Sequence, residues 1–395
     1  MKNSPCVAIV FPLFIGCITL ADTVPETKTL PDGSSVMALS GHTSMIMSID
    51  LSSDGKKVVT ACSDRTIRIW DSESGKELHK LLGGGTGARF FPDGKKIVTF
   101  GATRDAIIWD AQSGEKLKIL NGGGVDGNAC FSPDGRRIAL EVPDFPTRIF
   151  ATKIWDADTG EELFKLEKTR NIYDPISFSP DGKKFVAVMS SGTVIYDIST
   201  GKELATLEAG RKRLRSVVFS TDGKKLLAVD NSQGETGITE VVTLDIDSKK
   251  VSQRIALGTI DRWAFHVADF SLDRTKIVTA RIVGSGNPEE PDDVTNSLVQ
   301  VWDTNSGKEL QKWESPEEIV YALFMPEGKK ILAYSSENTI RIYDTDSGNE
   351  LKKLERPPDW IFNYALALSP DGKKVVMVGQ VRKDNDAIVR TWILE

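Results

Sequence analysis

The sequence is poor in the side chains on which most catalytic and metal sites depend. It contains three histidines, His42, His79 and His266, and their positions give no metal-ligand spacing. It has no Gly-x-Ser-x-Gly motif, no sequence typical of a cysteine nucleophile, and no glycine-rich segment that opens a phosphate-binding helix. We therefore predict that the protein is not an enzyme and uses no cofactor or metal ion.

An excess of positive charge is also missing. The chain has 50 Lys and Arg against 56 Asp and Glu, a net charge of −6 and a pI near 5.4. Nucleic-acid binding proteins need a broad positive field to attract phosphates, and this composition does not supply one. We predict no nucleic-acid partner, although a local basic patch remains compatible with the composition.

One long apolar run, from Cys6 to Leu20, stands at the start of the chain. Lys2 precedes it and the small-residue site Thr19-Leu20-Ala21 follows it, an arrangement typical of a secretory signal peptide. We predict that residues 1–21 are a cleaved signal peptide and residues 22–27 a short linker. The protein would then be exported to the periplasm or the extracellular space, with no membrane span after cleavage.

Two alternatives for this segment stay open. One is an uncleaved membrane anchor, which Pro12 and the shortness of the run disfavour. The other is lipid attachment at Cys17, because Phe14-Ile15-Gly16-Cys17 resembles a bacterial lipobox.

Cysteine is scarce beyond the predicted signal peptide, where only Cys62 and Cys130 remain. Each lies in a strand-like run, and a whole repeat separates them. We expect two small buried thiols rather than a disulfide.

What the sequence has in abundance is one turn. Its consensus is Ser-Pro-Asp-Gly-Lys-Lys, in which Pro and Asp favour the turn and Gly adopts a left-handed conformation. Eight copies recur 39 to 54 residues apart, with their Gly position at Gly55, Gly94, Gly135, Gly182, Gly223, Arg274, Gly328 and Gly372. In the sixth copy Arg274 replaces glycine, and its Cβ should cost about 1 kcal/mol if the left-handed conformation is kept.

A second signal follows each turn. In six copies an apolar strand ends in an aromatic residue and Asp, and in most copies a Gly turn leads to one more strand. Leu244-Asp245 and Trp392-Ile393 are degenerate versions of the strand end. Each repeat therefore holds four strands, named a to d: a before the first turn, b after it, c ending in the aromatic residue, and d after the Gly turn. The aromatic pairs are Trp70-Asp71, Trp109-Asp110, Trp155-Asp156, Tyr196-Asp197, Trp302-Asp303 and Tyr343-Asp344.

These repeats resemble the WD-repeat β-propeller family, whose blades are four-stranded antiparallel sheets. The best copy runs from Ser40-Gly41-His42 to Trp70-Asp71. The resemblance implies that His42, Thr60, Asp64 and Trp70 form a structural hydrogen-bonded tetrad. The other repeats have lost the Gly-His pair, so the resemblance implies this tetrad in the first blade only.

The ends of the chain predict the number of blades. The last repeat stops after its c strand, while residues 34–39 form a spare strand before the first repeat. Pairing the two would complete the last blade and leave no open edge. We predict a single all-β domain over residues 28–395, an eight-bladed propeller, with seven blades as the alternative.

Function is expected where the repetition stops. In such blades the a–b and c–d turns share one end, and the b–c and d–a links share the other. Insertions swell the b–c links at residues 143–152, 231–237, 284–296 and 382–386, and the d–a links carry arginines and aromatic residues. Such residues are typical of binding hot spots, so we predict partner binding by Arg170, Tyr173, Arg211, Arg213, Arg215, Arg262, Trp263, Trp360 and Phe362.

The predicted function is a non-enzymatic scaffold of the cell envelope or extracellular space, a monomer that binds a protein or peptide. The cluster of arginines around Arg211 favours an acidic partner. Glu289, Glu290, Asp292 and Asp293 could in principle bind calcium, but Pro288, Pro291 and the missing EF-hand order favour a solvated charge run. The alternative function is a propeller hydrolase or lactonase with a polar site at the mouth of the central channel.

Overall fold

The computed structural model describes residues 7–10, 28–29, 35–38, 41–83, 85–101, 105–123, 129–144, 149–169, 176–189, 192–207, 214–230, 238–259, 267–283, 296–354, 360–381 and 387–394. Their regular structure consists of 34 β-strands in eight sheets. The chain is thus an all-β, eight-bladed β-propeller, as predicted, and the seven-bladed alternative is wrong. No helix in the described part of the chain is long and apolar enough to cross a membrane.

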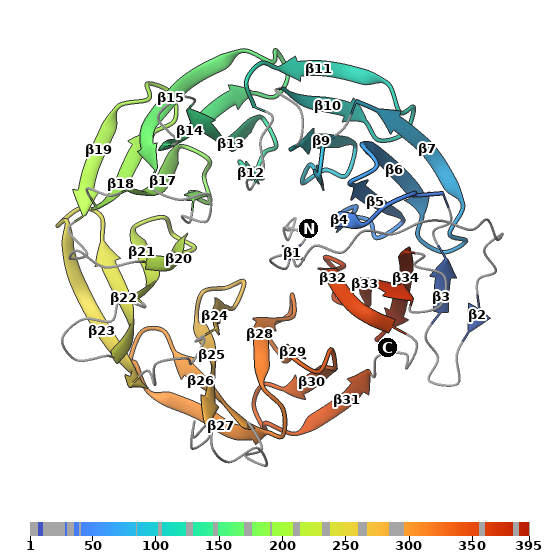
Figure 1. The fold of residues 1–395 in the computed structure, drawn as a ribbon. Helices are drawn as coiled ribbons and strands as arrows, with labels where there is room; N and C mark the ends of the chain where they lie inside the picture. Colours follow the sequence, from blue (N-terminus) through green and yellow to red (C-terminus); the bar gives the residue numbers. More distant parts are fainter. Residues whose placement is uncertain are drawn as a thin grey trace. The chain divides into compact units, whose positions relative to one another are not determined.

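The chain divides into two compact units, residues 1–173 with 357–395, and residues 174–356. Three blades of the first unit are consecutive four-stranded sheets (Figure 1). Blade 1 contains β4 (Ile46–Leu51), β5 (Lys57–Cys62), β6 (Thr66–Asp71) and β7 (Glu77–Leu82). Blade 2 contains β8 (Gly87–Phe90), β9 (Lys96–Phe100), β10 (Ala106–Asp110) and β11 (Lys116–Leu120). Blade 3 contains β12 (Ala129–Phe131), β13 (Arg137–Asp144), β14 (Ile149–Asp156) and β15 (Glu162–Thr169).

The second unit holds blades 4 to 7, each again four antiparallel strands in chain order. Blade 4 contains β16 (Ile176–Phe178), β17 (Lys184–Met189), β18 (Gly192–Asp197) and β19 (Glu203–Leu207). Blade 5 contains β20 (Leu214–Phe219), β21 (Lys225–Asp230), β22 (Ile238–Asp245) and β23 (Lys250–Thr259). Blade 6 contains β24 (Val267–Phe270), β25 (Lys276–Val283), β26 (Asn296–Asp303) and β27 (Glu309–Ser315). Blade 7 contains β28 (Ile319–Phe324), β29 (Lys330–Ser335), β30 (Ile340–Asp344) and β31 (Glu350–Leu354).

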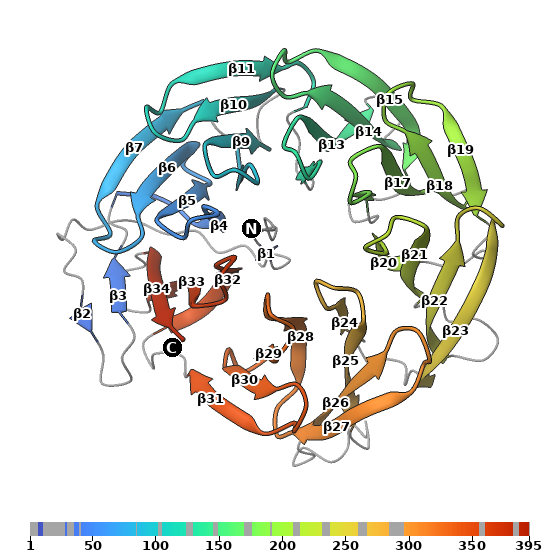
Figure 2. The same ribbon diagram turned by 180° about the vertical axis from the view of Figure 1, so that it is seen from behind.

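Blade 8 joins both ends of the chain, as Figure 2 shows from behind. Its strands are β32 (Trp360–Leu368), β33 (Lys374–Val381) and β34 (Ala387–Ile393), with β3 (Ser35–Ala38) in the d position. Met37 of β3 lies opposite Val389 of β34, so the predicted pairing of the spare strand is confirmed. Two strands extend this sheet at its edges: β2 (Lys28–Thr29) beside β3, and β1 (Val7–Val10) beside β32.

The repeated turn explains why each hairpin forms. In blade 1 the Gly55 amide donates to the Ser52 carbonyl at 2.8 Å, and the Ser52 hydroxyl donates to Asp54 at 2.6 Å. Gly55 has a φ of +67°, the left-handed conformation that the sequence predicts. Arg274 keeps the same conformation, with a φ of +61°, so the expected strain of about 1 kcal/mol applies there.

Within each unit the core lies between neighbouring sheets, and blade 1 is buried on both faces. On one face of blade 1, Val58 and Trp70 pack against Val376 of blade 8. On the other face, Val59 packs with Ile97 of blade 2. The unalternating apolar b strands follow from this burial on both sides, as expected for a sheet without a solvated face.

The two cysteines differ in their surroundings. Cys62 is buried, whereas Cys130 is only half-buried, and both are thiols outside any disulfide. Cys130 lies on the short a strand of blade 3, and Cys62 ends the b strand of blade 1.

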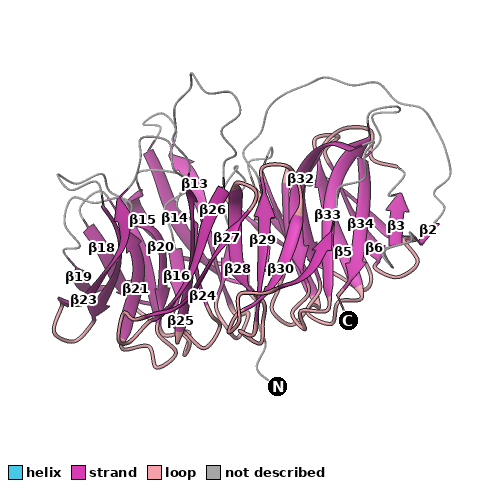
Figure 3. Cartoon of the chain, turned by 90° about the horizontal axis from the view of Figure 1, so that it is seen from below, coloured by secondary structure: helices cyan, strands magenta, loops and turns pink. Residues whose placement is uncertain are grey.

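Hairpin turns gather at one end of the sheets within each unit, where Figure 3 shows them in pink. We call this end, with the a–b and c–d turns, the regular end, and the other the irregular end. Blade 3 corrects one predicted boundary at the irregular end, because β13 continues to Asp144 and β14 begins at Ile149. The b–c link of this blade is therefore shorter than the predicted 143–152.

Carboxylates tie neighbouring a strands together. Asp50 of β4 is 1 % exposed and accepts the amide of Phe90 in β8 at 2.9 Å. Asp269 of β24 accepts the amide of Phe324 in β28 in the same way, at 3.1 Å. Because these acceptors come from one blade and the donors from the next, they fix the register between adjacent sheets.

The carboxyl of Asp269 should make stability depend on pH. Burial raises the pKa of Asp269 to about 6, although the Phe324 amide and Arg274 oppose the shift. The folded state therefore holds a proton that the unfolded chain loses near pH 4, and stability falls as pH rises from 4 to 6. The shift corresponds to about 3 kcal/mol. We expect Asp269→Asn, measured by urea unfolding at pH 4 and pH 7, to remove this decline; parallel pH profiles of the two proteins would contradict the assignment.

Candidate binding site

Most residues predicted to bind a partner lie outside the described residues: Arg170, Tyr173, Arg211, Arg213, Arg262 and Trp263, together with Cys17 and the acidic residues 289–293. The other three correct the sequence interpretation, because they belong to strands rather than to links. Arg215 lies in β20, and Trp360 and Phe362 begin β32. Aromatic residues favour strands, and pairing of Trp360 with Val381 lengthens the hairpin into the region predicted as a link.

The best described part of the irregular end is a hydrogen-bonded network in blade 1. The Trp70 indole N–H donates to the Thr60 hydroxyl at 2.8 Å, and that hydroxyl lies 2.8 Å from His42 Nε2. His42 Nδ1 lies 3.1 Å from Asp64 Oδ2. A carboxylate can only accept, so Nδ1–H donates to Asp64 and Nε2 accepts from Thr60. The four side chains implied by the family resemblance are thus joined from the c strand to the b–c turn.

Asp64 connects two backbone segments of this end. It accepts the amide of Thr43, in the link that enters blade 1, at 3.0 Å, and the amide of Thr66, in strand c, at 2.8 Å. Burial opposes the charge of Asp64, but hydrogen bonds from His42, Thr43 and Thr66 hold its pKa well below the usual range. Burial lowers the pKa of His42, which favours the neutral imidazole. The d–a link and the b–c turn therefore form one rigid surface.

Sequence reasoning missed a second anchor beneath this surface. Arg68, 7 % exposed, donates to the Glu77 carboxylate and to the Gly41 carbonyl. Gly41 has a φ of +135°, a conformation that other residues rarely adopt, and an added Cβ would also lie 2.2 Å from the Arg68 guanidinium, so glycine is favoured there. The sequence does carry a signal for this contact, since an arginine two residues before the aromatic and a glutamate at the start of strand d recur together in blade 7.

The network presents one exposed cation. Arg65 is the residue at the tip of the b–c turn, its side chain is exposed, and its φ is +66°. The Arg65 amide donates to the Cys62 carbonyl at 3.1 Å, which closes the turn. A non-glycine residue rarely keeps this conformation unless its surroundings impose it, and such strain is common at binding sites.

Blade 7 builds the same end with different residues. The Tyr343 hydroxyl lies 3.2 Å from Ser315, which occupies the position of His42, so the longer phenol spans the gap that Thr60 fills in blade 1. Arg341 donates to Glu317 and to Glu350, both at 2.5 Å. This ion pair ties the link that enters the blade to strand d, as Arg68 does in blade 1.

Among the residues that the structure describes, one group of side chains has the spacing of a metal site. The ligand atoms of His42, Cys62 and Asp64 lie within 4.8 Å of one another. Metal binding needs a thiolate, yet burial raises the pKa of Cys62 to about 12, and both His42 nitrogens already form hydrogen bonds. The arrangement fits a structural network better than a metal centre.

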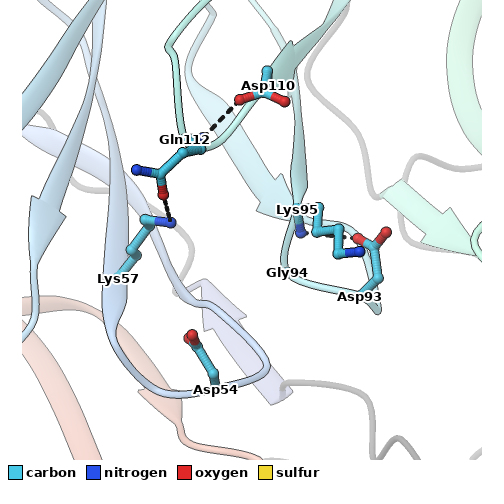
Figure 4. Close-up of a pocket in the computed structure, with 7 residues that line it drawn as sticks. All are labelled: Asp54, Lys57, Asp93, Gly94, Lys95, Asp110 and Gln112. Carbon is cyan, nitrogen blue, oxygen red and sulfur yellow. Dashed lines mark hydrogen bonds between the residues drawn. The ribbon is translucent and has the colours of Figure 1, made fainter.

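The regular end has a polar hollow of about 400 Å³ between blades 1 and 2 (Figure 4). Its carboxylates serve the turns: Asp93 accepts the Lys95 amide at 2.9 Å, and Asp110 accepts the Gln112 amide at 2.8 Å. Lys57 donates to the Gln112 side chain across the two blades at 3.0 Å. The hollow is therefore a by-product of hairpin closure and blade contact.

The sequence favours a solvated, charged surface at the regular end, but some of its lysines form ion pairs between neighbouring blades. The lysine two residues after the Gly position of a turn reaches the c–d turn of the next blade: Lys96 lies 2.6 Å from Asp158, and Lys276 lies 2.9 Å from Asp346. Exposed ion pairs contribute about 0.2–1 kcal/mol each, so their effect is to align blades rather than to hold the core.

Comparison with protein-family models identifies a WD domain, G-beta repeat, at residues 33–71, which includes the whole blade 1 network. Mitochondrial division protein 1 of Mycosarcoma maydis is 38 % identical over 58 residues, 15 % of this chain. The match spans 7 % of that relative's length.

Among solved structures, the computationally designed Ika8 protein is similar, with a TM-score of 0.64 and 20 % identity. The match covers 90 % of this chain and 98 % of the designed one. At this identity the likeness concerns the fold alone.

Proposed function

Because the chain is a WD40-repeat β-propeller, we propose that it is a non-enzymatic scaffold that binds a protein or peptide at the irregular end of its blades. The observation that carries the proposal is the blade 1 network. His42 and Asp64 fix the entering link and the b–c turn, and the turn holds Arg65 exposed in a strained conformation. Arginine on a rigid turn is well suited to bind the carboxylates of a partner.

The proposed partner is acidic and is met outside the cytoplasm. The arginines around Arg211 and the exposed Arg65 support the first point, and the signal-like residues 1–21 support the second. We propose export, with cleavage after Ala21, and binding as a monomer.

Charge reversal at the irregular end tests this function. We expect Arg65→Glu to reduce capture of the partner from an envelope extract by about ten-fold or more, since a hot-spot arginine contributes over about 1.4 kcal/mol. Arg65→Gly should reduce capture less, because it removes the guanidinium and relieves the strain without adding a repelling charge. Capture is measured by quantitative mass spectrometry after cross-linking.

Arg136→Glu is the matched control. Arg136 is exposed on an a–b turn of blade 3 at the regular end, and the charge change is identical. Equal losses in the two variants, or cross-links confined to the regular end, would refute the proposed binding surface.

A further inference from the structure

The inner edge of blade 8 carries an additional strand. β1 pairs antiparallel with β32, with Val7 opposite Leu368 and Ile9 opposite Leu366. Figure 1 shows β1 beside β32, on the side away from β33. β32 has nine residues, whereas the a strands of the other blades have three to six. The edge of β32 is therefore long enough to pair with a further strand.

The direction of the backbone groups along this edge follows from the a–b turn. The Ser369 amide donates to the Lys374 carbonyl of β33 at 2.9 Å. The backbone N–H and C=O groups of successive residues in an antiparallel strand point to opposite sides. Those of Leu368 and Leu366 therefore point toward β1. The backbone groups of their partners Val7 and Ile9 point back toward β32, whereas the amide of Ala8 points away from it.

In two other blades, the amide at the position of Leu368 donates a hydrogen bond to an acceptor outside its own sheet. Phe90 and Phe324, like Leu368, directly precede the a–b turn. Their amides are received by carboxylates, Asp50 and Asp269 respectively. In blade 8 a paired strand lies at the corresponding position, and backbone pairing serves where a carboxylate serves elsewhere.

The surroundings select the chemistry of the occupant. Leu366, Ala367 and Leu368 are at most 2 % exposed, so a strand added beside them continues an apolar sheet. A charged side chain there would lose its hydration without a partner. The seated segment, Val-Ala-Ile-Val, is uncharged and rich in β-branched residues, which suits an extended strand.

We propose that the inner edge of β32 is a strand-binding site for an extended, uncharged apolar peptide segment, and that Val7–Val10 is an exchangeable occupant. A partner segment of the same chemistry takes the edge when Val7–Val10 is withdrawn, as cleavage after Ala21 would bring about. This site is separate from the irregular end, and it does not depend on the partner proposed there.

The alternation of amides supplies a matched pair of variants in the full chain. Ile9→Pro removes an amide that points into the ladder, whereas Ala8→Pro removes one that points away. We expect hydrogen exchange at Leu366 and Leu368 to be about ten-fold faster or more in Ile9→Pro than in Ala8→Pro or the unaltered chain. Thermal unfolding should stay the same, because β1 lies at the edge of the sheet.

Binding is measured with a synthetic peptide of residues 6–11, with Cys6→Ser and two lysines added at its carboxyl end, by fluorescence anisotropy. The Ile9→Pro chain should bind this peptide saturably at one site, with about ten-fold higher affinity than the unaltered chain. Bound peptide should restore slow hydrogen exchange at Leu366 and Leu368. The same peptide with the Ile9→Pro change should bind neither the Ile9→Pro chain nor the unaltered chain.

Two results would overturn the proposal. Equal exchange in the two proline variants would mean that β1 does not protect this edge. Faster exchange in Ile9→Pro without peptide binding would mean that the edge is not a docking site. Neither readout involves the irregular end, so failure here is distinguishable from failure of the proposed scaffold function.

Discussion

Trp70→Ala should lower the free energy of unfolding by about 3–5 kcal/mol. Trp70 is 2 % exposed and packs between the sheets of blades 1 and 8 against Ala367 and Val376. Its removal leaves a cavity that rigid strands on both sides fill poorly, and it also removes the donor to Thr60. Urea unfolding followed by circular dichroism measures the change.

Trp70→Phe separates packing from hydrogen bonding. Phenylalanine retains most of the apolar contact but cannot donate to Thr60, so the expected loss includes about 1 kcal/mol for the hydrogen bond and remains well below that of alanine. If both variants lost the same free energy, the indole N–H rather than the packing would account for the contribution of Trp70. Trp313, half-buried in strand d of blade 6, is a control site where alanine should cost less.

Met37→Pro should cost about 3 kcal/mol, because it breaks the pairing of β3 with β34 that completes blade 8. Proline removes an amide and fixes φ away from the extended value, and the exposed edge of β34 then lacks its d strand. Urea unfolding measures the loss, and analytical ultracentrifugation tests for association through the freed edge.

Met37→Leu is the control, since it keeps the amide and a similar side-chain volume. A stability equal to that of the unaltered chain in Met37→Pro would show that β3 adds nothing to blade 8. If Met37→Leu lost as much free energy of unfolding as Met37→Pro, the effect would be due to the side chain rather than to the pairing of β3 with β34.

The repeated elements were predictable because their signals are local. The Asp-Gly turns and the aromatic-Asp strand ends each lie within ten residues, and they correctly predicted the hairpins and the eight repeats. The incomplete last repeat and the spare strand before the first one correctly predicted the pairing of β3 with β34. Arg274 was predictable for the same reason, since one position in a known turn decides its conformation.

The site was only partly predictable. His42 and Asp64 follow the family pattern. The Arg68 contacts, and the hydrogen bond between Tyr343 and Ser315 in blade 7, depend instead on residues that meet across strands. Trp360 and Phe362 were predicted to lie in a d–a link; the length of β33 opposite them decides for a strand.

The sequence by itself determined the repeat, the turns, the number of blades and the strand that completes the last one. Each of these depends on short-range backbone preference and on a period of apolar residues, both of which can be read along the chain. The tertiary structure decided which carboxylates become buried acceptors, which lysines join neighbouring blades, and that Val7–Val10 lies against β32. These features depend on distances between residues far apart in sequence, which packing of one sheet against the next brings together.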